Sequence, residues 1–359
     1  MTREFYVNDA GNQINKFGAS LSVRYMQLFE GEEKHPLPED CYQGMDILDH
    51  AREFAKLYGD KYVNAPEEER RKALVDYALP LNIAALERDL GRYRIHYDVW
   101  FRESVLHREG KVTAICEKLK ENGWAYEKEG ALWYNNIKMM IEKAEKAGKP
   151  LSEAEIAELK DDVLVRANGV PTYFAADIAY HYNKFAERGF HRVINIWGAD
   201  HHGHVARLKG AMDAVGLDGN KLDIVLMQLV RLMKDGQPYR MSKRSGRAVT
   251  LTDLLDDVPI DAARFFFNMR EPNATFDFDL DLAVQQSSEN PVYYVQYAHA
   301  RICSVLKLVM AEGLTEEDIH NADLGLLTTP EERELCRALG QMPDEVIAAA
   351  KYYDPARMT

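Results

Sequence analysis

Cysteine is scarce in this sequence and follows no pattern. The 359 residues contain four cysteines, Cys41, Cys116, Cys303 and Cys336, and no two of them form a C-x-x-C pair. A disulfide framework or a structural zinc site needs cysteines at closer and more regular spacing. We therefore expect four reduced thiols.

Long apolar runs are also missing. No stretch approaches the roughly 20 apolar residues of a membrane-spanning helix, and the start of the chain lacks the basic-then-apolar layout of a signal peptide. With 46% apolar and 29% charged residues, the composition is typical of a soluble globular protein of two or three domains. We expect a cytoplasmic protein that does not contact membranes.

An excess of positive charge is the third absence. The sequence has 45 lysines and arginines against 58 aspartates and glutamates, a net charge of −13. Bulk attraction therefore cannot bring this protein to nucleic acid. Any contact with RNA has to come from a local basic patch.

One basic patch follows a predicted hairpin. An apolar run, Ile224 to Val230, leads into Asp235-Gly236, which suits a tight turn with positive φ, so a short β-ribbon at a sheet edge should present the next loop. Lysine, serine, glycine and free backbone amides are donors that suit a polyphosphate. A solvated basic hairpin is the alternative. The loop has four cations within eight residues: Arg240, Lys243, Arg244 and Arg247.

A second candidate site lies on a helix predicted from Tyr173 to Glu187, with Thr172 as its cap. Tyr173, Asp177 and His181 are four residues apart and therefore share one face of that helix. The row fits a ligand site, and it also fits a buried polar row in a helix packed on a sheet. The residues alone favour the buried row.

A third candidate site follows an apolar strand, His191 to Trp197. Gly198 supplies the turn, and a helix is predicted from Asp200 to about Val215. Open α/β sheets bind nucleotides at such strand ends. The nearby histidines, His201, His202 and His204, do not indicate zinc, because a fourth ligand at suitable spacing is missing and two of the three would point apart on a helix.

Periodicity, caps and turn residues predict the other elements. Strands are expected at 3–9, 93–101 and 163–166, and a hairpin at 124–134. Helices are expected at 47–58, from Pro66 through Tyr77, at 111–122, at 135–162 with a Ser152–Glu155 capping box, after a cap at Thr252, from Asp261, from Asn290, at 330–339 and at 344–352.

Five separated stretches together resemble the arginyl-tRNA synthetases, which are class I aminoacyl-tRNA synthetases. TREFYVNDAGNQ, VPTYFAADIAYH, WGADHHGH and YRMSKRSG occur in that family's order, and SENPVYYVQYAHAR is nearly identical to a family segment. The resemblance covers nearly the whole chain except about 135–162. Arg240 and Arg244 depart from the generic K-M-S-K-S motif. His202-Gly203-His204 matches the H-x-G-H motif by accident, because it lies at the wrong place in the order.

The resemblance implies an α/β fold. Residues 1–288 would be the second part of a class I synthetase catalytic domain, with a partial Rossmann-like nucleotide-binding fold, a parallel sheet, a helical insertion at about 20–90 and a surface insertion at about 135–162. Residues 289–359 would start an all-α anticodon-binding domain, truncated before its bundle closes. The family's H-I-G-H segment is absent, so we expect a chain that begins inside a domain and does not charge tRNA alone.

The reaction implied by the resemblance is that of an arginine–tRNA ligase. ATP activates L-arginine, and the arginyl group is then transferred to tRNA(Arg). Carried over residue by residue, the family implies three groups: Tyr173, Asp177 and Asp200 for arginine, Gly198, Asp200, His201, Met241 and Lys243 for ATP, and Lys243 with Ser242 and Met241 for catalysis. The expected protein is a monomer that takes ATP with Mg²⁺ and has no metal site of its own.

The sequence leaves two other interpretations open. The chain could be a fragment that binds substrate or tRNA without activity alone, and the reading frame upstream of Met1 and downstream of Thr359 would decide this. Another class I synthetase or nucleotidyltransferase with a basic phosphate loop is disfavoured by Asp177. An acidic group in the amino-acid pocket suits a cationic side chain.

Overall fold

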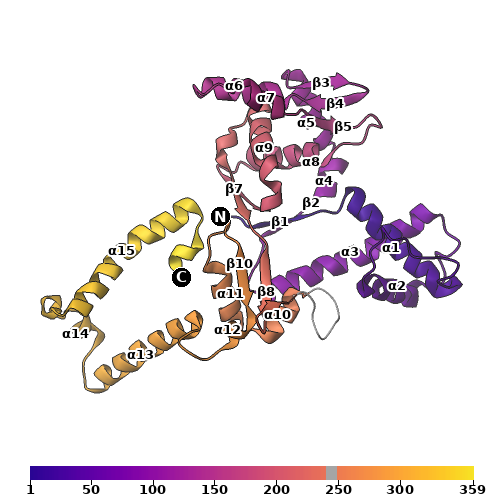
Figure 1. Ribbon diagram of the computed structural model, residues 1–359. Helices are drawn as coiled ribbons and strands as arrows, with labels where there is room; N and C mark the ends of the chain where they lie inside the picture. Colours follow the sequence, from indigo (N-terminus) through magenta and orange to yellow (C-terminus); the bar gives the residue numbers. More distant parts are fainter. Residues whose placement is uncertain (240–248) are drawn as a thin grey trace. The chain divides into compact units, whose positions relative to one another are not determined.

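The computed structural model describes residues 1–239 and 249–359 (Figure 1). These residues divide into two compact units. Unit 1 consists of Met1–Val193 and Gly203–Asp223, and unit 2 of Ile194–His202 and Ile224–Thr359. Among the helices of the described residues, none is both long and apolar enough to cross a membrane. The domain boundary expected after residue 288 stays a prediction.

Three helices of unit 1 share a core of their own. Tyr25, Phe54 and Leu74 are fully or almost fully buried at its centre. The predicted helix that ends at Gly59, which has φ of +58°, is confirmed, and so is the helix that follows Pro66. The three helices are α1 (Gly11–Glu30), α2 (Met45–Tyr58) and α3 (Glu67–Arg92). Helix α1 was not among the helices predicted from periodicity.

A parallel strand pair carries the first part of the candidate site. Strand β1 (Glu4–Val7) pairs with β2 (Val99–Arg102), and Glu4 lies opposite Val99. The strand predicted at 3–9 is confirmed. The strand predicted over 93–101 is shorter than expected, because Tyr93 ends α3 and Arg94 has φ of +60°, which turns the chain before the strand begins.

Further helices and an antiparallel sheet, in the order β3-β4-β5, make up most of the rest of unit 1. The predicted hairpin at 124–134, the helix at 111–122 and the Ser152–Glu155 capping box are confirmed. The elements are α4 (Glu103–Arg108), α5 (Lys111–Glu121), β3 (Ala125–Lys128), β4 (Ala131–Tyr134), α6 (Asn136–Lys146), α7 (Glu153–Glu158), β5 (Asp162–Val165) and α8 (Tyr173–Tyr182).

The segment predicted as a surface insertion, 135–162, has one buried face. Met139 of α6 is buried, and a Cβ built on Gly210 would lie 3.0 Å from its Cγ. Gly210 belongs to α9 (His202–Ala214), so α6 is packed closely against that helix. Helix α7 has no buried residue. That this segment is an insertion relative to its family stays a prediction.

Two predicted helix boundaries are wrong, one by five residues and one by two. Helix α8 does not run to Glu187, because its last turn widens into a π-helix, η1 (Asn183–Glu187), in which the Arg188 amide donates to the Asn183 carbonyl at 2.9 Å. Strand β6 (Val193–Gly198) includes the predicted turn glycine. A 3-10 turn, η2 (Ala199–His201), then delays α9 to His202.

Strand β6 pairs with β7 in a two-stranded sheet. Strand β7 (Leu222–Met227) follows a short 3-10 turn, η3 (Gly219–Lys221). The apolar run 224–230 is therefore not one element, because β7 ends at Met227 and a strand of another sheet begins at Val230.

The sheet of unit 2 has the order β10-β8-β9. Strand β10 runs parallel to β8, and β9 is antiparallel to β8 at the sheet edge. The predicted hairpin is confirmed, since Asp235 and Gly236 have φ of +52° and +69°. The elements are β8 (Val230–Lys234), β9 (Gln237–Pro238), α10 (Leu251–Asp257), α11 (Ile260–Asn268), β10 (Phe276–Asp279) and α12 (Leu280–Val284).

The cap predicted at Thr252 is wrong. Thr250 caps α10 instead, because its hydroxyl accepts from the Asp253 amide at 3.1 Å and the Asp253 carboxylate accepts from the Thr250 amide at 3.0 Å. This reciprocal pair is a capping box. Thr252 lies inside the first turn, where it cannot cap.

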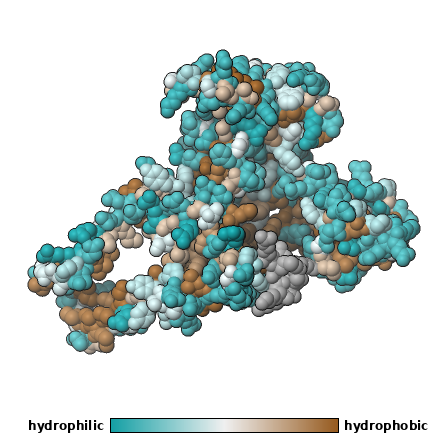
Figure 2. Space-filling view, in the orientation of Figure 1, coloured by the Kyte–Doolittle hydropathy of each residue, from teal (hydrophilic) through white to brown (hydrophobic). Residues whose placement is uncertain are grey.

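The C-terminal helices of unit 2 are mostly exposed. The helix predicted from Asn290 is confirmed, and Val295, Ile302 and Val305 of its apolar face are at least half exposed. Figure 2 shows hydrophobic surface, in brown, among hydrophilic surface over the C-terminal helices. The two helices predicted at 330–339 and 344–352 are one continuous helix that contains Pro343. The elements are α13 (Pro291–Ala311), α14 (Glu316–His320), η4 (Leu324–Leu326), α15 (Pro330–Tyr352) and η5 (Pro355–Met358).

The four cysteines are free thiols, and their burial predicts the order of their reactivity. Cys336 is exposed and Cys303 partly exposed, whereas Cys41 and Cys116 are buried. Burial also raises the pKa of the Cys116 thiol to about 11, and the thiol is far less nucleophilic than the thiolate. We expect a thiol reagent at pH 8 to label Cys336 first and Cys303 next. Labelling of Cys116 without denaturant would contradict the packing of α5.

Candidate functional site

Tyr173 and Asp177 lie on the first turns of α8. Thr172 caps this helix, since its hydroxyl accepts from the Ala175 amide at 3.5 Å. The Asp177 side chain is 32% exposed and Tyr173 is 48% exposed, so both can meet a ligand. His181 is 2% exposed and donates through Nδ1 to the Asp177 carbonyl at 2.7 Å. Of the three residues predicted to share one face of this helix, Tyr173 and Asp177 are thus accessible and His181 is buried.

The ring of Tyr173 lies against the start of α1. A Cβ built on Gly11 would come within 3.5 Å of the Tyr173 hydroxyl and 3.7 Å of its Cε1. Gly11 also has φ of +76°, in the left-handed region that favours glycine. A Cβ at these distances would be in ordinary van der Waals contact with the ring, so the backbone conformation of Gly11, and not lack of space, favours glycine here.

His204 of α9 is the nearest partner of the Asp177 carboxylate. Its Nε2 lies 3.0 Å from Asp177 Oδ2, and its Nδ1 lies 3.2 Å from Arg207 Nη2. The His204 ring also packs edge-on against Phe174, with 5.3 Å between centroids. Sequence reasoning missed this contact, since it considered His204 only as part of an accidental motif and as a zinc ligand, which it rejected. The one available signal was the spacing of His204 and Arg207, three residues apart on one helix face.

Several buried polar groups lie within electrostatic reach of Asp177. Burial raises the pKa of the Tyr6 and Tyr180 hydroxyls, so both remain neutral donors at physiological pH. Burial raises the pKa of the Glu103 carboxyl, and hydrogen bonds from His107 and Tyr6 partly offset this rise. Burial also lowers the pKa of Lys184 to about 8. Beside these groups, the Asp177 carboxylate is a partly exposed negative charge.

Ion pairs fix the far end of the same helix. Arg188 Nη1 lies 2.6 Å from Glu4 Oε2, and the Tyr180 hydroxyl donates to the other oxygen of Glu4. Because Glu4 begins β1, these bonds hold the helix against the parallel strand pair. Asp177 is thus carried by a rigid element, as a binding residue should be.

The predicted nucleotide residues Gly198, Asp200 and His201 lie together in unit 2, at the end of β6. The side chains of Asp200 and His201 are 81% and 59% exposed, with 3.8 Å between Asp200 Oδ2 and His201 Nε2. The His201 ring is 5.9 Å from that of Trp197. A Cβ on Gly198 would lie 2.4 Å from Asp200 Oδ1, so glycine lets this carboxylate fold back over the turn. Tyr173 and Asp177 form a separate group in unit 1.

The basic loop is not among the described residues. Met241, Ser242 and Lys243, together with Arg240, Arg244 and Arg247, lie outside them, and their roles stay predictions. Within residues 1–239 and 249–359, no three His, Cys, Asp or Glu side chains converge as metal ligands.

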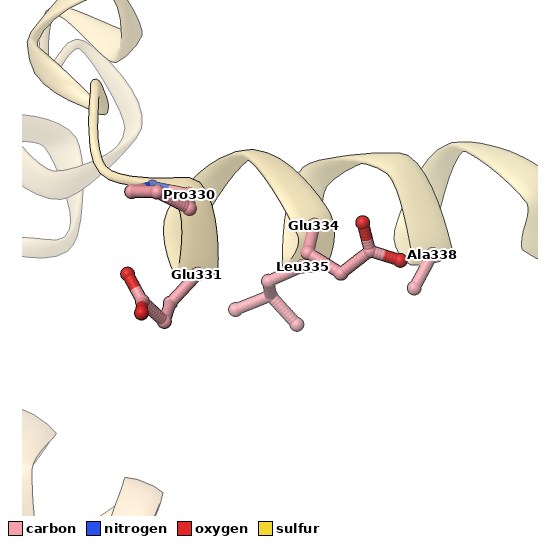
Figure 3. Close-up of a pocket in the computed structure, with 5 residues that line it drawn as sticks. All are labelled: Pro330, Glu331, Glu334, Leu335 and Ala338. Carbon is pink, nitrogen blue, oxygen red and sulfur yellow. The ribbon is translucent and has the colours of Figure 1, made fainter.

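A hollow on the surface of α15 is not a substrate site. Figure 3 shows its five lining residues projecting from a single helix, with no facing wall drawn beside them. Glu331 and Glu334 are its only charged members, and Leu335 is 61% exposed. A specific ligand site needs polar groups that converge from several directions around an enclosed volume. The hollow is lined by Pro330, Glu331, Glu334, Leu335 and Ala338.

Two family models match this chain. The catalytic domain of class I tRNA synthetases (R) matches residues 29–303, and the DALR anticodon binding domain matches residues 295–359. The chain therefore carries a class I tRNA synthetase catalytic domain. It belongs to the arginyl-tRNA synthetase family, as the motifs predicted.

Curated relatives agree over the whole chain. The arginine–tRNA ligases of Caldanaerobacter subterraneus subsp. tengcongensis and Ruminiclostridium cellulolyticum are 55% and 53% identical over 359 residues, which is 100% of this chain. The same alignments cover 60% and 61% of those proteins. The chain thus spans about three-fifths of the length of the curated relatives it matches.

Solved structures share the fold. The structure of a proposed arginyl-tRNA synthetase from Campylobacter jejuni has a TM-score of 0.82 at 33% identity, covering 99% of this chain and 72% of that one. Arginyl-tRNA synthetase from Thermus thermophilus has a TM-score of 0.67 at 21% identity, covering 99% and 64%. The second likeness concerns the fold alone. Both agree with the predicted α/β class I fold followed by a helical anticodon-binding domain.

Proposed function

We propose that this chain supplies the arginine-binding and ATP-binding parts of an arginine–tRNA ligase. The observation that carries the proposal is the Asp177 carboxylate, which is partly exposed one helical turn after the exposed Tyr173. Family membership supports the reaction: ATP activates L-arginine as the adenylate with release of pyrophosphate, and the terminal ribose of tRNA(Arg) accepts the arginyl group.

The proposed arginine contact follows from the shape of the ligand. A guanidinium presents its donors in a planar fork, and a carboxylate accepts two of them side by side. Asp177 is the proposed carboxylate. The ring of Tyr173 would pack on the aliphatic stem of arginine, or its hydroxyl would accept a further hydrogen bond. Asp200, in unit 2, is proposed as a further arginine-binding residue.

The proposed ATP contacts lie at the end of β6 and in the basic loop. Gly198, Asp200 and His201 would line the adenylate pocket. Lys243, with Met241 and Ser242, would stabilise the phosphates as pyrophosphate leaves, because a fixed positive charge is most effective where negative charge develops. Magnesium would enter bound to the ATP phosphates, which suits its preference for oxygen ligands. We further propose a cytoplasmic monomer.

The proposal is tested by amino-acid-dependent exchange of pyrophosphate into ATP. The protein is produced as its gene encodes it, with tRNA(Arg) present, and arginine is compared with lysine and citrulline. We expect exchange with arginine alone. Comparison with lysine tests whether the planar fork of the arginine guanidinium is required. Comparison with citrulline tests whether its positive charge is required, since citrulline has a similar shape but is neutral. Equal exchange with citrulline would contradict recognition by a carboxylate.

Lys243→Ala should slow arginyl-adenylate formation by at least about tenfold, while the affinity for arginine changes little, because a charge that acts on the transition state affects rate more than ground-state binding. Arg240, Arg244 and Arg247 should limit the loss by retaining positive charge in the loop. Single-turnover adenylate formation and arginine titration measure the two quantities. Lys149→Ala, which removes an exposed lysine elsewhere, is the control. If arginine affinity fell while the chemical step stayed fast, the role of Lys243 would be wrong.

A further inference from the structure

We propose that His204 is a positioning residue that orients the Asp177 carboxylate and thereby strengthens the selection of arginine over citrulline. The inference rests on the proposed arginine site at Asp177. His204 is on α9 and Asp177 is on α8, so the contact joins two helices of unit 1.

The protonation of the His204 ring follows from its two neighbours. Arg207 Nη2 lies 3.2 Å from His204 Nδ1, and a guanidinium can only donate hydrogen bonds. His204 Nδ1 must therefore accept, which leaves the proton of the neutral ring on Nε2. That nitrogen lies 3.0 Å from Asp177 Oδ2 and donates to it. Arg207 thus selects the tautomer that can bind Asp177.

Arg207 is itself held in place. Its Nη1 donates to Asp162 Oδ1, and its Nε donates to the Gly203 carbonyl at 3.1 Å. Its guanidinium also lies 5.9 Å from the Phe174 ring. The Asp162 side chain is 17% exposed, at the start of β5. A chain of hydrogen bonds therefore runs from Asp162 through Arg207 and His204 to Asp177.

The geometry leaves Asp177 able to bind a ligand. An ionised carboxylate has about four acceptor positions, of which His204 uses one. Within the part of the chain that the structure describes, no hydrogen bond reaches Asp177 Oδ1. The side chains of Asp177 and His204 are 32% and 17% exposed, so the carboxylate is the more accessible of the pair. His204 therefore holds one oxygen from the protein side while the carboxylate remains open to a guanidinium.

The test compares two substitutions that differ in their ability to donate. His204→Leu removes the donor, whereas His204→Gln provides an amide N–H at nearly the same reach as Nε2. We expect His204→Leu to lower kcat/KM for arginine about tenfold to a hundredfold, since this bond is made to a charged group. The loss should appear in the KM for arginine, with the KM for ATP unchanged. His204→Gln should stay within about threefold of wild type, on the same conversion.

A double-mutant cycle shows whether His204 acts through Asp177. If it does, adding His204→Leu to Asp177→Asn should cause little further loss, because coupled residues are not additive. A nitrogen NMR spectrum of the wild-type histidines should also show His204 protonated at Nε2. His191→Leu, at an exposed histidine before β6, is the matched control and should leave both KM values unchanged.

The outcomes separate this inference from the proposed function. If His204→Leu keeps wild-type arginine kinetics, or if His204→Gln fails as badly as His204→Leu while both are folded by circular dichroism, His204 does not position Asp177. Additive losses in the double mutant overturn the inference as well. If wild type does not use arginine, or Asp177→Asn has no effect, the arginine site itself is wrong.

Discussion

Asp177→Asn should lower arginine use by at least about a hundredfold, because removing one member of a desolvated, hydrogen-bonded charge pair costs on the order of 3 to 5 kcal/mol and about 1.4 kcal/mol corresponds to a factor of ten. The substituted amide has the same shape as the carboxylate. It lacks the charge, and it presents a donor where the guanidinium needs an acceptor. Much of the expected loss is the cost of leaving the guanidinium without its partner.

The selectivity of Asp177→Asn is as informative as the size of its effect. The margin of arginine over citrulline should narrow, because neutral citrulline loses less than charged arginine when the carboxylate is removed. The KM for ATP should barely change. Pyrophosphate exchange in the presence of tRNA(Arg) measures the use of arginine, the use of citrulline and the KM for ATP.

A matched substitution controls for the loss of a negative charge. Asp49 is 63% exposed on α2 and pairs with Arg52 at 3.3 Å. Asp49→Asn should leave the exchange kinetics unchanged, because an exposed ion pair contributes little. If exchange depended on arginine in the same way in Asp177→Asn as in wild type, Asp177 would not be an arginine-binding residue. Within the described residues, its carboxylate would then have only the structural contact with His204.

Phe54→Ala should destabilise the three-helix body of unit 1 by about 3 to 5 kcal/mol, the usual cost of deleting a buried aromatic ring. Phe54 is 1% exposed. Its ring centroid is 4.5 Å from that of Tyr58, and Tyr25, Tyr62 and Tyr77 lie at 5.6, 5.4 and 5.5 Å. The cavity would be bounded by rigid rings on all three helices and could collapse only partly.

Urea unfolding monitored by helical circular dichroism measures the effect of Phe54→Ala. Phe29 is a suitable control, since its ring centroid lies 5.1 Å from that of Tyr25 but the residue is 42% exposed. Phe29→Ala should cost about 1 kcal/mol or less, because the substitution leaves no enclosed cavity. Equal losses for the two substitutions would mean that Phe54 is not at the centre of this core.

Elements defined by local chemistry were predicted well. The turn at Asp235-Gly236 and the capping box at Ser152 depend on residues next to each other in sequence, and both are as expected. Thr250 was missed because Thr252 has the same capping chemistry, and only the position of Asp253 three residues after Thr250 distinguishes them. The helices expected at 330–339 and 344–352 are joined, because α15 runs through Pro343. No residue of α15 is buried, so little packing opposes a local adjustment of the backbone around the proline ring.

The candidate site was predictable where motifs carry it and not where tertiary contacts do. Asp177 and Tyr173 were predicted as site residues because family resemblance adds to their helical spacing, and their roles stay predictions. His204 was missed because its partner lies 27 residues earlier on another helix, and neither periodicity nor spacing relates the two. The difference in exposure between Tyr173 and His181 also depends on which elements pack around α8. Single-sequence patterns do not include that information.

The π turn at the end of α8 separates the two tasks of that helix. One residue corresponds to about 100° of rotation around a helix axis, so the wider turn sets the direction in which every later side chain points. Deleting one residue from 183–187 would swing Arg188 away from Glu4, while Tyr173 and Asp177, which precede the turn, would keep their places on the first turns. Changes in sequence before the π turn can therefore alter the surroundings of Tyr173 and Asp177 while the contact between Arg188 and Glu4 is kept. Changes after it can alter that contact while Tyr173 and Asp177 keep their places.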